Sequence, residues 1–379
     1  MRQFLSILIF STLFIAPGIS SAQYLCVNDK SGRKGAQNQD INRSLDAARD
    51  PLTIAFTRSR NSLATTKECI ATANTQSTGL SGDFIDSLGK VLSHDARTKQ
   101  IKKECIEASL QREPGNEGYS CNGDERKKFE NYGRSTPCLN QKTVDFIHFS
   151  VNQAINCMST GRGAIDPRFI LKKLNNETAF NFYLAYSGGK GIGQLTSDPV
   201  DEIAGWYKGK KFIEGNAFHI LEDLMDSTNP SCAPFREIMK GDLKRPPPSP
   251  GAPRNYCDWI RPGDGVARNL IYSLGYYIHM RDNVIRPSLE ARSKKLAKNS
   301  DIVNYLTLAA YGPDGPAGAK SLIRRLRLSD STGIIDAKSK IISGDPYVKQ
   351  TEKKFVEELL PAIKANPTEA DKKGDICLQ

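Results

Sequence analysis

The sequence has no apolar run long enough to cross a membrane once its first 22 residues are set aside. A spanning helix needs about 20 consecutive apolar residues, and no later segment of the chain approaches that. Histidine is scarce as well, and the four histidines stand apart without making a metal-binding motif. We therefore expect a mature chain with no transmembrane segment, no metal site and no bound cofactor.

The nine cysteines lack the short paired spacing of a zinc site. They stand singly along the chain, which favours a disulfide framework in an exported protein. The stretch at 244–254 (KRPPPSPGAPR) cannot be helical, because its prolines remove hydrogen-bond donors and fix an extended backbone. Cys232 and Cys257 bracket this stretch, so we predict a disulfide between them that closes a proline-rich insertion at about 232–257.

Two further pairings are open. Cys69 and Cys105 each lie in a copy of the tetrapeptide KECI, and a helical hairpin clamped by these two cysteines is one interpretation. Chance repetition of four common residues is the other. We also expect two of Cys26, Cys157 and Cys377 to pair with each other.

The first 22 residues are typical of a secretory signal. Arg2 supplies the positive start, residues 4–15 supply an apolar core, and Ala22 ends a small-residue cleavage site. We therefore expect the mature chain to begin near Gln23 and to be exported, either to the periplasm or out of the cell.

The formal net charge of the whole chain is +11. Such a charge favours polyanionic partners without saying which. The Lys and Arg residues are dispersed and no nucleic-acid-binding motif accompanies them, so we expect no nucleic-acid partner.

Helical periodicity dominates and predicts a mainly α fold. We expect residues 23–140 to form a helical, disulfide-containing N-terminal region, 141–365 to form a second domain, and 366–379 to form a C-terminal tail. Apolar residues at helical spacing predict helices from about 144 to 157, 266 to 280 and 302 to 311. A further stripe around Phe84 predicts a helix in the N-terminal region.

Glu177 lies at the end of another predicted helix. Asp166 followed by a proline is a helix start, and from there Ile170, Leu174 and Glu177 fall on one face. A carboxyl that continues an apolar stripe is poorly solvated, which raises its pKa and suits a general acid near neutral pH. An exposed glutamate at a frayed helix end is the alternative.

The glycines at 188–193 do not make a phosphate-binding loop, because no Ser or Thr follows Lys190. Glycine also lets a backbone approach a ligand closely. That property suits a polymer lying across the site.

Three segments in order resemble the motifs of lysozyme-like lytic transglycosylases, over about residues 144–330. They are Glu-Thr-x-Phe at 177–180, a segment with Ala185, Ser187, Gly188 and Gly-Ile-Gly-Gln-Leu at 191–195, and Leu-Ala-Ala-Tyr at 308–311. The family patterns read Glu-Ser-x-Phe, Gly-Leu-Met-Gln and Ala-Tyr-Asn. The chain departs from them at Thr178 in place of Ser, Gly193 in place of Met, and Gly312 in place of Asn.

The resemblance implies a lysozyme-like catalytic domain that binds peptidoglycan glycan strands in a groove. Glu177 is then the single catalytic residue, which cuts the bond between N-acetylmuramic acid and N-acetylglucosamine and leaves 1,6-anhydro ends. Gln194 and the backbone from Gly191 line the groove near the acetamido groups, and Tyr311 holds Glu177 or a sugar hydroxyl. Thr178 and Ser187 complete the expected substrate-binding set.

Two alternatives remain at this stage. A lysozyme-type muramidase of the inverting kind needs a second carboxylate, for which Asp198 and Asp201 are candidates, although both fit better as residues that cap a helix at its start. The other alternative is a protein that binds cell-wall glycan without cutting it.

Overall fold

The structure is a computed structural model that describes residues 45, 48–66, 141–159, 165–178, 180, 182, 185–186, 188–207, 210–211, 219–252, 255, 257–261 and 263–359. Several predictions fall outside these residues. They concern the signal segment, the helix around Phe84, the pairing of Cys69 with Cys105, the role of Ser187, and the C-terminal tail.

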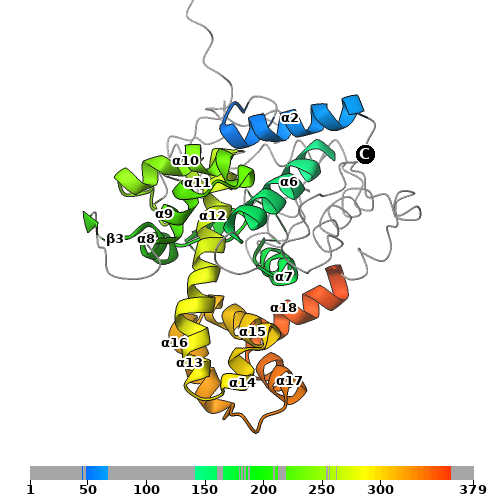
Figure 1. The fold of residues 1–379 in the computed structure, drawn as a ribbon, viewed down its shortest axis with the longest axis vertical. Coiled ribbons are helices and arrows are strands. Elements are labelled where there is room, and N and C mark those ends of the chain that lie inside the picture. The colour runs from blue at the N-terminus through cyan, green and yellow to red at the C-terminus, as the bar shows by residue number, and fades with distance from the viewer. Residues whose placement is uncertain are drawn as a thin grey trace, which may run out of the picture.

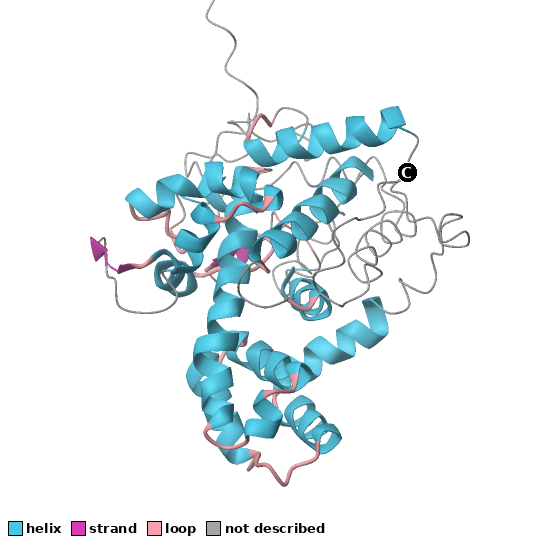
Figure 2. Cartoon of the chain, viewed as in Figure 1, coloured by secondary structure: helices cyan, strands magenta, loops and turns pink. Residues whose placement is uncertain are grey.

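The described part of the chain is mainly α, as the sequence predicts. The strands described in it form two antiparallel pairs, β1 (Ala185–Tyr186) with β2 (Gly189–Lys190) and β3 (Trp206–Tyr207) with β4 (Lys210–Lys211). Helices make up the rest of its regular structure (Figure 2). They are α2 (Pro51–Thr66), α6 (Gln141–Met158), α7 (Pro167–Thr178), α8 (Ser197–Ala204), α9 (His219–Asp226), the 3₁₀ turn η5 (Pro230–Cys232), α10 (Ala233–Lys244), α11 (Cys257–Ile260), α12 (Asp264–His279), the π-helical η7 (Met280–Ile285), α13 (Arg286–Glu290), α14 (Lys294–Ala297), α15 (Ser300–Tyr311), α16 (Gly315–Arg325), α17 (Ile334–Gly344), α18 (Pro346–Lys354) and the π-helical η8 (Phe355–Leu359).

Helix α12 is the centre of the molecule. It continues without a break through η7 into α13, and this long helical rod runs from the upper half to the lower end (Figure 1). In the upper half it packs against α6, α8, α10 and α11, whereas its lower continuation packs against α14, α15 and α16. Almost every residue of α12 is buried, because helices cover it on several sides.

Helix α2 belongs to the same core as the later helices. It packs against α6 and α10, and the ring of Phe56 meets the ring of Phe146 edge to face with centroids 5.5 Å apart. Both side chains are fully buried. The described part of the N-terminal region therefore shares its apolar core with the rest of the protein.

The helices predicted from periodicity within the described residues are confirmed. α6 and α15 span their predicted ranges, α12 ends at His279 where the π-helical η7 continues it, and α7 starts at the expected proline. At the start of α15 the side chain of Asn299 accepts a hydrogen bond from the backbone N–H of Ile302, which satisfies one of the free donors of the first turn. Gly312 ends the same helix.

The predicted disulfide between Cys232 and Cys257 is wrong, because Cys232 pairs with Cys157. This also excludes a pairing of Cys157 with Cys26 or Cys377. Cys232 ends η5, and η5 packs against α6, which carries Cys157. The bridge thus ties together two elements 75 residues apart in the sequence.

The proline-rich stretch is non-helical from Arg245 to Ala252, as expected, but it is packed against the protein rather than projecting from it. The indole Nε1 of Trp259 donates a 3.0 Å hydrogen bond to the carbonyl of Pro248. The hydroxyls of Ser249 and Ser197 lie 2.6 Å apart. Hydrogen bonds to α8 and to the buried Trp259 therefore hold the stretch, without the predicted bridge.

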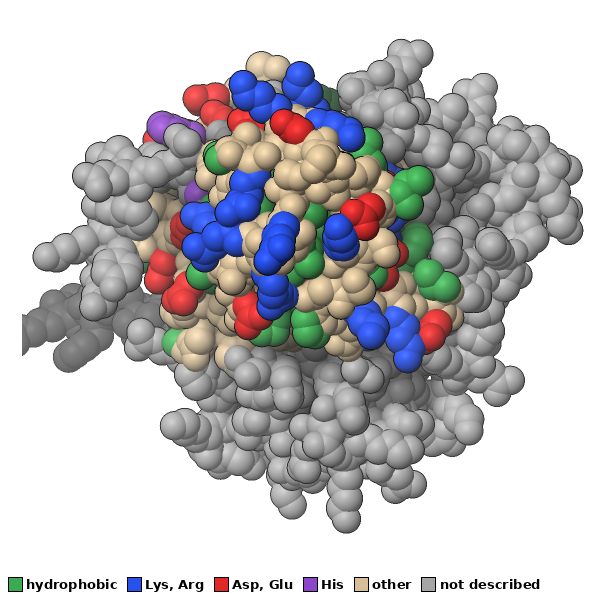
Figure 3. Space-filling model, turned by 90° about the horizontal axis from the view of Figure 1, so that it is seen from below, with side chains coloured by type: hydrophobic (Ala, Val, Ile, Leu, Met, Phe, Trp, Pro, Cys, Tyr) green, Lys and Arg blue, Asp and Glu red, His purple; other side chains and the backbone are tan. Residues whose placement is uncertain are grey.

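Exposed cationic side chains gather at the end of the molecule formed by α13 to α17, which Figure 3 views directly. Acidic side chains are fewer on this end. The exposed cations are Arg292, Lys294, Lys295, Lys298, Lys320, Arg324, Arg325, Arg327 and Lys340. The positive charge of the chain is thus partly concentrated on one face.

None of the helices in the described ranges has the length and apolar character needed to cross a membrane.

Candidate functional site

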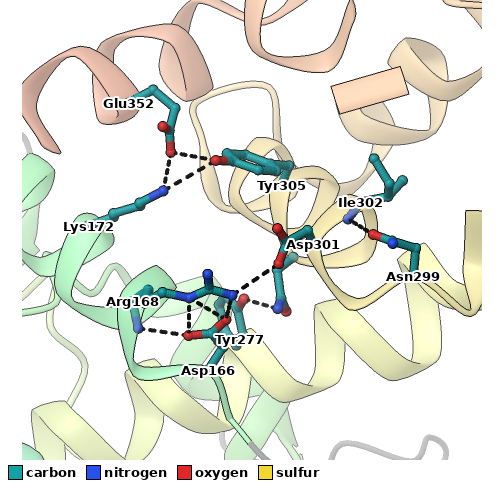
Figure 4. A network of polar contacts seen from close by, with 10 residues as sticks. Asp166, Arg168, Lys172, Tyr277, Asn299, Asp301, Ile302, Tyr305 and Glu352 are labelled. Carbon is teal, nitrogen blue, oxygen red and sulfur yellow. Dashed lines mark hydrogen bonds and ion pairs between the residues drawn. The ribbon is translucent and has the colours of Figure 1, made fainter. Parts of the chain in front are cut away.

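The start of α7 is fixed by a carboxylate cap and an ion-pair chain. Asp166 Oδ1 accepts a 3.0 Å hydrogen bond from the backbone N–H of Arg168, as the sequence predicts for a helix that begins with Asp-Pro. The guanidinium of Arg168 also binds the Asp166 carboxylate and reaches Asp301 of α15 at 3.0 Å (Figure 4). These contacts hold the first turn of α7 against α15.

A second polar cluster joins the middle of α7 to α18. The buried ammonium of Lys172 contacts the Glu352 carboxylate, and the hydroxyl of Tyr305 donates a 2.9 Å hydrogen bond to the same carboxylate (Figure 4). Further along α18, Lys354 Nζ donates a 2.8 Å hydrogen bond to the carbonyl of Asn176. Helix α18 is therefore fastened along the C-terminal half of α7.

Glu177 lies at the end of α7, where these contacts leave its carboxyl partly buried. The hydroxyl of Tyr347, from α18, donates a 2.5 Å hydrogen bond to its Oε1. Burial raises the pKa of Glu177, while the positive charge of Lys173, the Tyr347 hydrogen bond and the charge of Lys354 act in the opposite direction. Burial prevails, so the carboxyl holds its proton to a higher pH than a solvated glutamate does.

Lys173 lies one helical turn before Glu177 and is fully buried, with an exposed fraction of 1%. Its Nζ donates hydrogen bonds to Ser273 Oγ at 2.9 Å and to the carbonyl of Gly193 at 3.3 Å. The same atom lies 3.7 Å from the centroid of the Tyr311 ring. Burial lowers the pKa of Lys173 to about 8, although the Glu177 carboxylate counteracts part of that effect.

Thr178 is buried, and its hydroxyl is used inside the protein. Its Oγ1 lies 3.2 Å from the carbonyl of Leu174 and 3.1 Å from the carbonyl of Ile192. The second contact joins the end of α7 to residues 188–194, which we call the glycine segment. The Thr178 hydroxyl therefore links the last turn of α7 to this segment, and the substrate contact expected of it stays a prediction.

The glycines of this segment are explained by close packing on α12. A Cβ atom on Gly191, whose φ is +70°, would lie 2.3 Å from Asn269 Nδ2. A Cβ on Gly193 would lie 2.6 Å from Ser273 Oγ. There is thus no room for the methionine that the resembling family has at this position.

Asn269, which is completely buried, holds the glycine segment on α12. Its Nδ2 donates a 2.6 Å hydrogen bond to the carbonyl of Lys190, and its Oδ1 accepts a 2.7 Å hydrogen bond from the backbone N–H of Gly193. One amide side chain thereby satisfies the backbone at both ends of the turn.

Gln194 has a left-handed backbone conformation with φ of 49°, in which its N–H donates a 2.9 Å hydrogen bond to the carbonyl of Gly191. Its side-chain Nε2 is buried and has no hydrogen-bond partner among the residues that the structure describes. A buried donor without a partner is energetically unfavourable, so this amide is suited to bind an acceptor on a ligand.

Tyr311 belongs to the cluster but is not the residue that holds Glu177. Its hydroxyl lies 3.3 Å from Ser273 Oγ, and its ring packs against Tyr276. The hydrogen bond to the Glu177 carboxyl comes from Tyr347 instead. Tyr311 thus contributes an aromatic face to Lys173 and a polar contact to α12.

The two aspartates considered as a second carboxylate lie on α8. The helix starts at Ser197 as predicted, with Thr196 at its N-cap position, yet Thr196 makes no capping hydrogen bond through its side chain. Asp198 is in the first turn, whereas Asp201 lies beyond it, contrary to expectation. Asp198 therefore favours the helix start through its charge alone.

Sequence reasoning missed four residues of the site, namely Lys173, Asn269, Ser273 and Tyr347. Lys173 was detectable in principle, because a lysine four residues before a helical glutamate lies on the same face. Asn269 and Ser273 also share a face of the long α12 helix, but nothing in the sequence shows that the glycine segment packs there. Tyr347 lies 170 residues from its partner, and no local pattern links the two.

No family model, curated protein or solved structure matches the chain at a significant level. Within the described residues, no group of three or more His, Cys, Asp and Glu side chains is placed to hold a metal ion.

Proposed function

We propose that this chain is a peptidoglycan-cleaving lytic transglycosylase with a lysozyme-like catalytic domain, in which Glu177 acts as both acid and base. The observation that carries the proposal is the meeting of three separate segments around one partly buried carboxyl. The segment at 177–180 touches the glycine segment through Thr178, and Lys173 bridges from the glycine segment to Tyr311. These are the segments that resemble the family's motifs.

The first chemical step requires a protonated carboxyl. Burial raises the pKa of Glu177, so the carboxyl keeps its proton to a higher pH than a solvated glutamate does, which favours its use as a general acid. Glu177 donates it to the oxygen that bridges N-acetylmuramic acid and N-acetylglucosamine while the bond from that oxygen to C1 breaks. The N-acetylglucosamine side leaves as an alcohol.

The second step uses the carboxylate that remains. It takes the proton from the 6-hydroxyl of the muramic acid while that oxygen forms a bond to C1, which closes the 1,6-anhydro ring and restores the protonated Glu177. Tyr347 supports both steps because burial and the nearby Glu177 raise its own pKa well above the usual value, so its hydroxyl stays a donor. Water is not consumed, and the chemistry needs no second carboxylate.

The glycine segment provides the substrate contacts in this proposal. Gln194 Nε2 is a buried donor without a partner in the described part of the chain, and the carbonyl of an acetamido group is a matching acceptor. The absence of a side chain at Gly191 and Gly193 lets this segment pack closely on α12. Export of the chain, which its first 22 residues favour, brings it to the compartment that contains this substrate.

The experiment is digestion of purified peptidoglycan by the mature chain, followed by mass spectrometry of the soluble products. Transglycosylase products are lighter than hydrolase products by one water molecule. Glu177→Gln keeps the shape of the side chain and removes the transferable proton, so we expect cleavage to fall by at least ~100-fold. Asp198→Asn and Asp201→Asn are the controls, and each is expected to retain most of the activity.

The two alternatives give different results. Reducing ends together with a severe loss in one aspartate variant indicate a muramidase. Sedimentation of the chain with peptidoglycan and no soluble product indicates a binding protein. Full activity in Glu177→Gln rules out both enzymatic mechanisms.

A further inference from the structure

Lys173 is a buried cation that the chemistry proposed above does not use. Its ammonium lies among groups from three elements besides its own, namely the Gly193 carbonyl in the glycine segment, Ser273 Oγ on α12 and the Tyr311 ring on α15. Glu177 is the carboxyl on the same face of α7, one turn further along. Lys173 thus joins α7 to three of the elements near the candidate acid.

Burying an ammonium group is costly unless hydrogen bonds and charge compensate for it. Here the compensation is incomplete: two neutral oxygens accept hydrogen bonds, and an aromatic face adds a cation–π contact. A methionine at this position would fill a similar volume without the desolvation cost. The buried lysine therefore lowers the stability of the fold. Residues that lower stability in this way are more often functional than residues of an ordinary core are.

The titratable groups around Lys173 and Glu177 come from four helices. The tyrosines among them are neutral near neutral pH, because burial raises the pKa of each one further above its usual value. The groups are Glu177 on α7, Tyr276 on α12 beside Tyr311 of α15, and Tyr347 and Lys354 on α18. Glu177 is therefore the one carboxylate among these groups that can compensate the charge of Lys173.

We propose that Lys173 is a positioning residue for glycan cleavage, whose ammonium holds the glycine segment and Tyr311 in place and faces the carboxylate that Glu177 becomes after giving up its proton. The catalytic part of this inference rests on the proposed function, but the coupling of Lys173 to Glu177 does not. In the acid step the cation makes Glu177 a stronger proton donor. In the base step it stabilises the carboxylate until the 6-hydroxyl proton arrives.

Coupling between two charges is reciprocal, so each group is tested through the other. Nuclear magnetic resonance on the full mature chain, labelled at Glu side-chain carboxyl carbons and at Lys side-chain nitrogens, follows both titrations without any substrate. In Lys173→Met we expect the midpoint of Glu177 to move to higher pH. In Glu177→Gln we expect the midpoint of Lys173 to move below its wild-type value.

Lys172→Met is the matched control. It removes a second buried ammonium from the same helix, but that ammonium contacts Glu352 and Tyr305 instead of the site. The charge of Lys172 is not among the causes that shift the pKa of Glu177, so its loss should move the midpoint of Glu177 less than the loss of Lys173 does. Lys173→Gln separates the two parts of the proposed role, because it retains an amide donor for Ser273 but not the charge.

Activity provides the second measurement. The rate of cleavage should fall at alkaline pH as Glu177 loses its proton, which gives the pH profile an alkaline limb. In Lys173→Met this limb should lie at higher pH than in the wild type. The maximal rate of this variant should be at least ~10-fold below that of the wild type. A purely structural role of Lys173 changes the rate or the stability but does not move the limb. The limb should move in Lys173→Gln as well, with a smaller loss of rate.

The proposal is overturned if the Glu177 midpoint is the same in wild type, Lys173→Met and Lys173→Gln. If Lys173→Met does not fold, the Lys173 midpoint in the nearly isosteric Glu177→Gln decides in its place, and an unchanged value overturns the proposal. Coupled midpoints in a chain that cleaves no peptidoglycan leave the pairing established and reject the proposed function. The two failures are therefore distinguishable.

Discussion

The hydroxyl of Tyr347 donates a hydrogen bond to Oε1 of Glu177 across 170 residues of sequence. The two residues come from α18 and α7, which Lys172 and Glu352 also join. The only acidic side chain at the end of α7 therefore does not stand alone in the folded protein. A neutral donor holds one oxygen of the carboxyl.

Tyr347→Phe should impair cleavage while preserving the fold. The hydroxyl of Tyr347 favours the ionised form of Glu177, so its removal raises the pKa of Glu177 and frees the carboxyl to rotate. We expect initial rates of glycan release to fall at least ~10-fold, since small displacements of a reacting group are costly. Tyr305→Phe removes a hydroxyl from Glu352 instead and should cleave normally. Equal rates for Tyr347→Phe and wild type would contradict the positioning role.

Glu177→Gln should stabilise the protein at neutral pH. The folded state raises the pKa of Glu177 above its unfolded value, so between those two values the folded chain binds more protons than the unfolded chain. The free energy of unfolding therefore falls as pH rises from the unfolded pKa to the folded pKa. Below the unfolded pKa the carboxyl is protonated in both states and causes no loss of stability. The gain in Tm of Glu177→Gln over wild type should be larger at pH 7 than at pH 4. A gain of the same size at both pH values would show that the carboxyl is solvated.

Gly193→Ala should lower the free energy of unfolding by ~1–3 kcal/mol, the usual cost of forcing an extra methyl into a packed site. The added Cβ would lie 2.6 Å from Ser273 Oγ and 2.8 Å from Ser273 Cβ. Gly241→Ala in α10 is the control, because nothing lies within 4 Å of its added Cβ. The control should gain ~0.5–1 kcal/mol from the better helix propensity of alanine. Denaturant titration of both variants measures the difference, and a neutral Gly193→Ala would mean that the segment does not pack on α12.

The bridge between Cys157 and Cys232 should appear in peptide maps made without reduction. Replacing both cysteines by alanine should lower the free energy of unfolding by ~2–4 kcal/mol, the typical contribution of a native disulfide. Denaturant titration of this double variant beside the wild type gives the size of the effect. A map that joins Cys232 to Cys257 would restore the pairing that the sequence suggests.

The helices were predictable because their signals are local. Asp166 followed by proline gives the start of α7, and the apolar spacing in α6, α12 and α15 gives their buried faces. The position of Glu177 at a helix end was predictable for the same reason.

The contacts of Glu177 were not predictable, because they depend on packing between distant segments. Tyr347 meets Glu177 only after α18 packs on α7, and Asn269 meets the glycine segment only after that segment packs on α12. The wrong disulfide has the same origin. Cys257 is the nearer cysteine in sequence, but the packing of η5 on α6 brings Cys157 to Cys232 instead.

The attachment of α18 to α7 also affects when the site becomes complete. A ribosome makes the chain from its N-terminus, so α7 is synthesised about 170 residues before the tyrosine that binds Glu177. A nascent or truncated chain that ends before residue 346 has the carboxyl but lacks both its hydroxyl donor and the helix that buries it. The environment of Glu177 therefore forms only after α18 has been made, when almost the whole protein has been synthesised.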